Sequence, residues 1–336
     1  MTTHTHIRIA AALVLAVAAA LVTTSSSPAA HTASSAYGWP VKPFDRPHPV
    51  RGGFGDPRTV FAGPPTQRTL LSGNGAFQFH NGVDISAPDG TAVYPVESGT
   101  VETVMHEWIG VTGADGRSFR YWHITPVVHL GQHVGADVTV LGRIIRGCGH
   151  VHLSEFDGGI AVSPLAAGHL SPYVDKTKPV VDSISFRSTT TGDALMPELL
   201  QGRIELIAGA HDMPNLPVPG VWHGLPVSPA LVTWRIEKAD TGKVVVPTHV
   251  AVDFRQQLPA DPDLWRVYAR GSHQNMSVFG KHYSYMQPGV YLFRLTPGGF
   301  DTRTLRNAVY ELIVTVADIR GNQTTSSVRF TVANAL

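Results

Sequence analysis

Cysteine is nearly missing from this chain, and charge is sparse. Cys148 is the single cysteine in 336 residues, so no disulfide can form within the chain. Charged residues account for 15% of the sequence, the formal net charge is +1 and no basic run occurs, so the electrostatic footprint of a nucleic-acid-binding protein is absent. The sequence also contains no glycine-rich phosphate loop and no dinucleotide fingerprint. We therefore expect neither nucleic acid nor a nucleotide as a partner.

The residues that are abundant favour β-structure. Hydrophobic residues make up 43% of the sequence, and 33 glycines and 25 prolines accompany them, which is typical of many short strands and turns. The length suits two domains that each bury a core. We predict an all-β protein with domains at residues 37–175 and 176–336. The sequence gives no indication of an oligomeric state.

The first 36 residues have the pattern of a secretory signal peptide. Arg8 precedes an apolar stretch, residues 9–22, and small residues suited to cleavage follow up to Ala36. The apolar stretch is shorter than the roughly 20 residues that span a membrane. We expect export to the cell wall or periplasm, with no membrane attachment after cleavage, and an uncleaved anchor is the alternative. No cysteine follows the stretch to carry a lipid.

A histidine and an aspartate lie four residues apart in His80-Asn81-Gly82-Val83-Asp84. Gly82 disfavours a helix here, because a glycine inside a helix costs about 1 kcal/mol. We therefore expect His80 to end a loop and Asp84 to lie on a strand at residues 83–86.

Two further segments supply imidazoles. His150 and His152 are one residue apart, so both point to the same face of a strand. The same alternation predicts a shared face for Tyr121 and His123, where the tyrosine either orients the imidazole or only packs. Two neutral imidazoles and one carboxylate around a divalent ion leave an open position, as in catalytic zinc sites. Two histidines would then remain for proton transfer.

These segments, in this order, resemble the lysostaphin-type M23 metallopeptidases. The resemblance covers roughly residues 39–173. It implies an antiparallel β-sheet fold and a zinc-dependent endopeptidase that acts on the peptides of bacterial peptidoglycan. The matching segments are Gly53-Phe54-Gly55-Asp56-Pro57-Arg58, His80 to Asp84, Gly99-Thr100-Val101, Tyr121-Trp122-His123, Gly131-Gln132-His133-Val134 and His150-Val151-His152.

Carried over position by position, the resemblance implies roles for five residues. His80, Asp84 and His152 would bind one zinc ion, and His123 and His150 would be the catalytic histidines. Zinc in such a site lowers the pKa of a bound water to about 7, which makes that water a nucleophile toward a peptide carbonyl at neutral pH. The free histidines would move protons and stabilise charge on the carbonyl oxygen, and which does which is open.

The chain departs from the family pattern near the last histidine pair. Ser154 stands where the family has a glutamate, and Glu155 follows on the opposite face of a regular strand. The preceding stretch is shortened to Arg146-Gly147-Cys148-Gly149. Residues 64–75 form a polar, glycine-punctuated segment that we expect to be a loop over the site.

Other interpretations remain open. Cys148 lies beside the histidine pair, so it is either the nucleophile of a cysteine peptidase or a small buried thiol. A catalytically silent protein that binds the wall or regulates another hydrolase is a further alternative. His129 and His133 flank a predicted turn and are expected to be exposed.

The second half of the chain has the pattern of a β-sandwich. Residues 171–179 read as an extended linker, and the closing pair of strands resembles the last hairpin of bacterial immunoglobulin-like modules, with Gly321 and Asn322 in the turn. The predicted strands are residues 180–186, 203–208, 231–237, 243–252, 289–295, 310–317 and 327–332.

Polar residues near the predicted turns allow two interpretations. Asp212, Asp318 and Asn322 either help to hold a calcium ion or cap turns. Residues 213–229, rich in proline and glycine, are expected to be a long surface loop that touches the wall or the catalytic domain.

Overall fold

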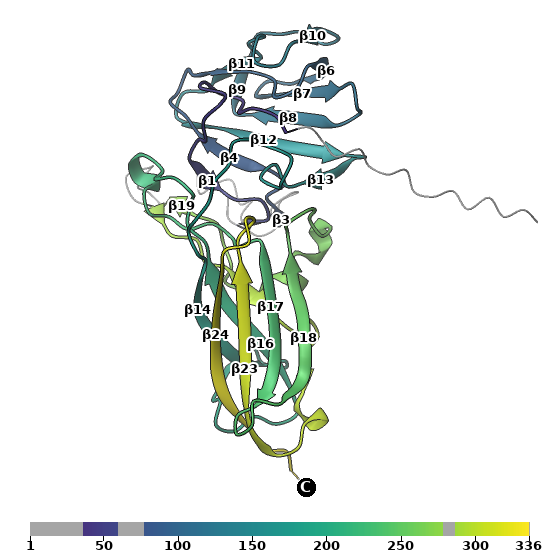
Figure 1. The fold of residues 1–336 in the computed structure, drawn as a ribbon, viewed down its shortest axis with the longest axis vertical. Coiled ribbons are helices and arrows are strands. Elements are labelled where there is room, and N and C mark those ends of the chain that lie inside the picture. Colours follow the sequence, from purple (N-terminus) through teal and green to yellow (C-terminus); the bar gives the residue numbers. More distant parts are fainter. Residues whose placement is uncertain (1–35, 60–76, 278–285, 336) are drawn as a thin grey trace, which may run out of the picture. The chain divides into compact units, whose positions relative to one another are not determined.

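The computed structural model describes residues 36–59, 77–277 and 286–335, and its regular structure is almost entirely β (Figure 1). All paired strands are antiparallel, as in β1 with β4 and β23 with β24, so the all-β prediction is confirmed. The α-helix α2 (Leu264–Val267) has four residues. Within the described ranges, no helix has the length and apolar character to cross a membrane. The predicted signal segment lies outside the described residues apart from Ala36.

The histidine segments lie on one large sheet with strand order β1-β4-β12-β8-β7-β6-β10 and β13 paired with β12. β12 lies between β4 and β8. A smaller sheet has the order β5-β11-β9, and β2 pairs with β3. The bounds are β1 (Val50–Gly52), β2 (Pro57–Arg58), β3 (Gln78–Phe79), β4 (Val83–Ser86), β5 (Ala92–Val93), β6 (Gly99–Val104), β7 (Trp108–Gly113), β8 (Ser118–Trp122), β9 (Ile124–Pro126), β10 (His133–Val134), β11 (Gly142–Ile144), β12 (His150–Asp157) and β13 (Ile160–Val162).

The pairing of β4 with β12 fixes which side chains meet. His152 lies opposite Asp84, and Val151 opposite Ile85, so one face carries polar residues while the other is fully buried and apolar. Gly82 allows this close approach, because a Cβ atom there would lie 2.2 Å from the carbonyl oxygen of Leu153. The prediction that Asp84 lies on a strand at residues 83–86 is confirmed.

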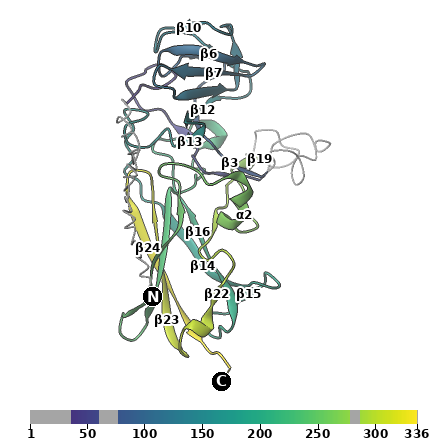
Figure 2. The same ribbon diagram turned by 90° about the vertical axis from the view of Figure 1, so that its right-hand side faces the viewer.

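Two further sheets face each other in the second half of the chain (Figure 2). Their orders are β15-β14-β16-β21, with β22 on β16, and β18-β17-β23-β24, while β19 pairs with β20. The ring of Phe186 lies 5.4 Å from that of Phe330 between them. The bounds are β14 (Val180–Ser188), β15 (Ala194–Leu195), β16 (Arg203–His211), β17 (Leu231–Lys238), β18 (Val244–Asp253), β19 (Met276–Ser277), β20 (Met286–Gln287), β21 (Leu292–Arg294), β22 (Phe300–Asp301), β23 (Ala308–Ala317) and β24 (Gln323–Val332), with 3₁₀ turns η1 (Gly220–Trp222), η2 (Asp261–Asp263) and η3 (Thr302–Thr304).

Each of the seven predicted segments contains a strand, and the two sheets pack as a sandwich. The turn between β23 and β24 is where the sequence predicts it: Gly321 has φ +87°. Asp318 Oδ1 accepts hydrogen bonds of 2.8 Å from the backbone N–H groups of Arg320 and Asn322. The likeness to immunoglobulin-like modules stays a prediction.

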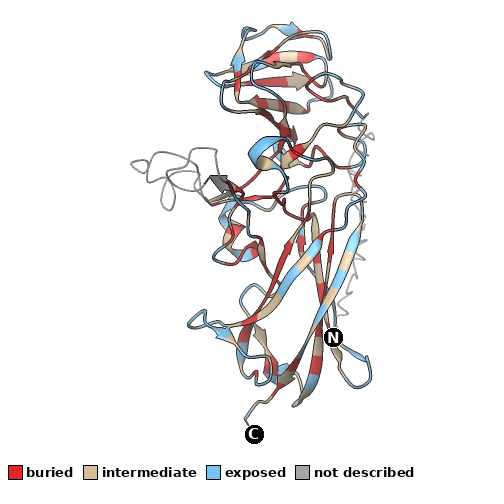
Figure 3. Cartoon of the chain, turned by 90° about the vertical axis from the view of Figure 1, so that its left-hand side faces the viewer, coloured by how far each residue is buried: buried red, intermediate tan, exposed pale blue. Residues whose placement is uncertain are grey.

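We call residues 37–175 the N-terminal module and residues 176–336 the C-terminal module. Residues 35–336 form one compact unit, so this division stays a prediction. Buried residues run along the strands of both modules (Figure 3). The two sets of sheets are joined by buried contacts, which we call the junction.

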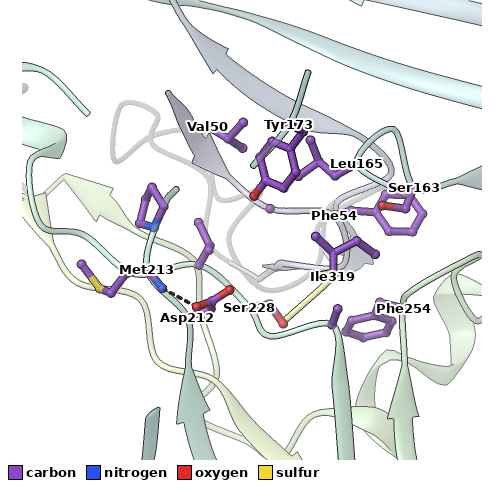
Figure 4. Close-up of a pocket in the computed structure, with 14 residues that line it drawn as sticks. Val50, Phe54, Ser163, Leu165, Tyr173, Asp212, Met213, Ser228, Phe254 and Ile319 are labelled. Atoms are coloured by element: carbon purple, nitrogen blue, oxygen red, sulfur yellow. Dashed lines mark hydrogen bonds between the residues drawn. The ribbon is translucent and has the colours of Figure 1, made fainter. Parts of the chain in front are cut away.

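Aromatic rings and hydrogen bonds form the junction. Phe79 packs against Phe254 at a ring distance of 5.7 Å, and the Tyr268 hydroxyl donates a 2.8 Å hydrogen bond to the Gly55 carbonyl. Gly55 has φ +92°, and a Cβ atom on it would lie 2.5 Å from the Phe254 ring. A small cavity at the junction is lined by Phe54 and other apolar side chains (Figure 4). The modules therefore pack directly on each other.

Candidate metal centre

Three side chains converge on the polar face of the large sheet. His80 Nε2 lies 2.7 Å from His152 Nδ1 and 3.1 Å from Asp84 Oδ1, and His152 Nδ1 lies 3.0 Å from the same oxygen. All three residues are buried. Ligands about 2.0–2.2 Å from one tetrahedral ion lie about 3.4 Å apart, so a slight outward movement makes room for zinc. Two imidazoles and one carboxylate are also donors that zinc prefers.

Neighbouring groups select the imidazole nitrogen that faces this point. His80 Nδ1 donates to the Gly53 carbonyl at 2.7 Å, which leaves the Nε2 lone pair available. Ser154 Oγ donates to Asn81 Oδ1 at 3.1 Å and accepts from His152 Nε2 at 2.7 Å, which leaves the Nδ1 lone pair available. Ser154 thus makes a contact with the ring of His152 from the position where the family resemblance expects a glutamate. Such outer contacts fix the tautomer of a metal ligand.

The protonation states also suit a cation. Burial lowers the pKa of His80 to about 4, so its imidazole is neutral at pH 7. Burial alone would raise the pKa of Asp84, but His80 and Arg58 outweigh it and hold that pKa well below its usual range. Arg58 Nη2 contacts Asp84 Oδ2 at 2.8 Å and leaves Oδ1 directed at the two imidazoles. Neutral imidazoles and an ionised carboxylate are the forms that bind metal.

The other two predicted histidines lie beside this group. His123 and His150 have ring centroids 4.5 Å apart, and His150 Nε2 lies 3.6 Å from Asp84 Oδ1. Burial lowers the pKa of both imidazoles. The structure therefore brings all five predicted site residues into one cluster.

Tyr121 does not share a face with His123 as the strand alternation predicts. β8 ends at Trp122, and His123 has φ +65°, so the regular alternation stops before it. Tyr121 is fully buried, and its hydroxyl accepts a 2.9 Å hydrogen bond from the N–H of Val96. In the described part of the chain, no hydrogen bond joins Tyr121 to His123. The structure therefore agrees with the interpretation that Tyr121 only packs, and not with the one in which it orients the imidazole of His123.

Two residues near the centre have no clear signal in the sequence. Arg51 Nη2 lies 2.5 Å from His150 Nδ1 and 2.8 Å from the carbonyl oxygen of Cys148. Its guanidinium also lies over the ring of Trp222, 4.1 Å from the centroid. Trp222 comes from η1, in the predicted loop at residues 213–229, so this loop reaches Arg51 and, through it, the five-residue cluster. No local pattern could pair residues so distant in the chain.

The structure also places the other residues that the sequence singles out near the histidine segments. Burial raises the pKa of the Cys148 thiol, and among the described residues no hydrogen bond links that thiol to an imidazole, so it lacks the features of an activated nucleophile. His129 and His133 are exposed, as expected. Glu155 faces away from the centre, as expected, and Arg117 Nη1 donates to it at 3.0 Å. The predicted loop at residues 64–75 lies outside the described residues.

A second group of carboxylates comes from Asp175 in the predicted linker and from Asp212 and Asp318 of the C-terminal module. Burial, then Asp175, raises the pKa of Asp212 to about 8, so this carboxyl is protonated at neutral pH. The N–H of Met213 donates to it at 2.9 Å (Figure 4). Asn322 Nδ2 donates to Asp318 Oδ2 at 2.6 Å. The N–H groups of Arg320 and Asn322 that donate to Asp318 match turn capping, whereas the convergence of the three carboxylates matches the calcium interpretation, so both interpretations remain.

No protein-family model and no curated protein matches the chain. Similar solved structures include the catalytic domain of the antimicrobial peptidase lysostaphin from Staphylococcus simulans, at 23% identity and a TM-score of 0.25, which covers 34% of this chain and 86% of that one. The SpoIIQ–SpoIIIAH pore-forming complex gives 22% identity and a TM-score of 0.30 over 39% of this chain and 89% of the other. Helicobacter pylori Csd3 gives 16% identity and a TM-score of 0.29 over 42% of this chain and 34% of its own. The neighbours thus include M23 peptidase domains, at low identity and over about a third of the chain.

Proposed function

We propose that the protein is a secreted zinc-dependent endopeptidase that hydrolyses peptide bonds in bacterial peptidoglycan, in crosslinks or stem peptides. One observation carries this proposal: His80 Nε2, Asp84 Oδ1 and His152 Nδ1 lie 2.7–3.1 Å apart, with a lone pair of each available to one cation. Peptidoglycan as the substrate rests on the family resemblance of the histidine segments.

The chain supplies both the metal ligands and the groups that handle protons. His80, Asp84 and His152 would hold zinc, which polarises a carbonyl and lowers the pKa of a water. Because zinc usually has four ligands, three protein ligands would leave one coordination position open for the carbonyl or the water.

Arg51 determines which nitrogen of His150 faces the site. His150 Nδ1 lies 2.5 Å from Arg51 Nη2, which can only donate, and 2.8 Å from the Cys148 carbonyl oxygen, which can only accept, and these two partners hold Nε2 toward the site. With its hydrogen on Nε2, the nitrogen 3.6 Å from Asp84 Oδ1, His150 would donate to a carbonyl oxygen on which negative charge grows. His123, neutral at pH 7 because burial lowers its pKa, is then left to accept a proton and return it to the leaving amine.

A release assay on purified cell walls tests this function. The full-length protein is incubated with walls in the presence of zinc, of phenanthroline or of a thiol alkylator, and released peptides are identified by mass. We expect release that phenanthroline abolishes and the alkylator leaves unchanged. Inhibition by the alkylator would instead indicate a cysteine peptidase that uses Cys148. A zinc-loaded protein that binds walls and releases nothing would be a silent wall-binding protein.

A further inference from the structure

A cavity of about 440 Å³ is lined by Gly149, the residue just before His150, and by Arg51, which contacts the His150 ring. Its walls come from both modules. Pro49, Pro88 and Gly149 of the N-terminal module line one side, and Val221 and Trp222 of η1 line the other. The volume is in the range of pockets that bind small molecules or side chains.

Two of the residues that line the cavity lie directly beside His150. Arg51 lines it and contacts His150 Nδ1 at 2.5 Å. Ser86 lines it and pairs with His150 in the register of β4 and β12. A peptide whose scissile bond lies at the histidines therefore meets this cavity with a residue that flanks that bond.

The walls determine the side chain that fits. Proline, alanine and tryptophan side chains present mostly carbon, and the Arg51 guanidinium is occupied by the Trp222 ring and by the Cys148 carbonyl oxygen. The carboxylate of Asp89 accepts hydrogen bonds of 2.7 and 2.9 Å from the N–H groups of Gly147 and Gly149. An apolar side chain suits such walls, whereas an acidic one would lie beside the Asp89 carboxylate.

We infer that this cavity is a substrate subsite for an apolar residue next to the scissile bond, and that Trp222 of the C-terminal module is its specificity-determining residue. The inference rests on the proposed endopeptidase function. It gives the C-terminal module a direct part in substrate selection through η1.

A peptide series tests the inference. After mass analysis has located the bond cut in walls, peptides that differ only in the flanking residue, Val or Asp, are assayed with the full-length protein. We expect the wild type to prefer Val by about tenfold or more in kcat/KM, which is the discrimination that one apolar pocket supplies. Trp222→Ala should remove most of this preference, chiefly by raising KM for the Val peptide, and Trp222→Phe should retain it.

Trp265→Ala is the matched control, because Trp265 is a half-buried tryptophan of the same module outside the cavity. It should keep the wild-type preference. The binding affinity of the Val peptide, measured by calorimetry, separates the two proposals. Peptide binding without cleavage by the zinc-loaded wild type would contradict the proposed function, yet a tenfold weaker affinity in Trp222→Ala would still support the subsite. Unchanged preference and affinity in Trp222→Ala would overturn the subsite.

Discussion

Ser154 shows how one hydroxyl can orient a histidine ring beside the candidate metal centre. Its Oγ lies 2.7 Å from His152 Nε2 and holds the ring with the other nitrogen toward the cation point. A serine is shorter than a glutamate, and the Ser154 hydroxyl in turn donates to Asn81 Oδ1 at 3.1 Å. The tautomer of His152 thus depends on a neutral pair of side chains.

Removal of that hydroxyl should weaken zinc binding. In Ser154→Ala, His152 Nε2 loses its acceptor, and loss of such an outer contact typically costs about 10–100-fold in metal affinity. Competition with a chromogenic chelator measures the zinc dissociation constant. Ser327→Ala, an exposed serine on β24, is the control and should bind zinc as the wild type does. Equal affinity in both variants would show that Ser154 does not orient the ring.

The two histidines of β12 should have separable roles. His152 Nδ1 belongs to the converging group, whereas His150 Nδ1 contacts Arg51. We expect His150→Ala to keep one zinc per chain and lose about 100-fold or more in turnover, and His152→Ala to lose the metal. Atomic emission and the wall-release assay measure the two properties. Equal zinc contents would contradict this division of roles.

At the scale of the element, strand periodicity was sufficient to place Asp84 and His152. Alternation along β4 and β12 is regular, since Val83 and Leu153 fill the core on the opposite face. The end of β8 could not be predicted in the same way, because His123 leaves the strand with φ +65° and no residue beside it signals the change. Short strands such as β15 and β22 escaped prediction because two residues show no period.

The contact between Arg51 and Trp222 illustrates a second limit of prediction from the sequence. It depends on how the two modules pack, which no local pattern encodes. The sequence predicts a long loop at residues 213–229 but not the residue that it brings to the cluster.

Asp212, directly after β16, should make stability depend on pH. Its pKa is about 8 in the folded chain, against about 4 in the unfolded chain, so between these values the folded state holds a proton that the unfolded state has released. The contribution of Asp212 to the free energy of unfolding is therefore complete below about pH 4 and falls as the pH rises toward 8. Asp212→Asn removes the titrating group and can still accept from the Met213 N–H.

We expect the stability of Asp212→Asn, relative to the wild type, to increase from pH 5 to pH 8 by about 1 kcal/mol or more, which is about 2–4 °C in Tm. Differential scanning calorimetry at both pH values measures this. Asp193→Asn, at an exposed position, should show no such trend. A pH-independent difference for Asp212→Asn would refute the elevated pKa.

At the scale of the whole molecule, the junction makes the stability of each module depend on the presence of the other. Phe54 and Phe79 are buried, and Phe79 packs against Phe254 and Tyr268 of the C-terminal module. Residues 37–175 alone would expose this apolar surface to water. We expect that fragment to bind a hydrophobic dye and to lack a cooperative thermal transition, which fluorescence and near-ultraviolet circular dichroism would show. A sharply unfolding, dye-free fragment would contradict this dependence.

Gly55 and Phe254 therefore bear on how this protein can be engineered. The Phe254 ring occupies the space that any side chain at position 55 would need, and the same glycine belongs to the turn just before Arg58, which contacts Asp84. Hybrid proteins that exchange the C-terminal module for a foreign one, joined by a flexible tether, would leave this turn without its aromatic support. A working chimera would have to be joined within the sandwich strands that follow Phe254 and Tyr268. The Phe254 ring and Gly55 would then come from the same protein.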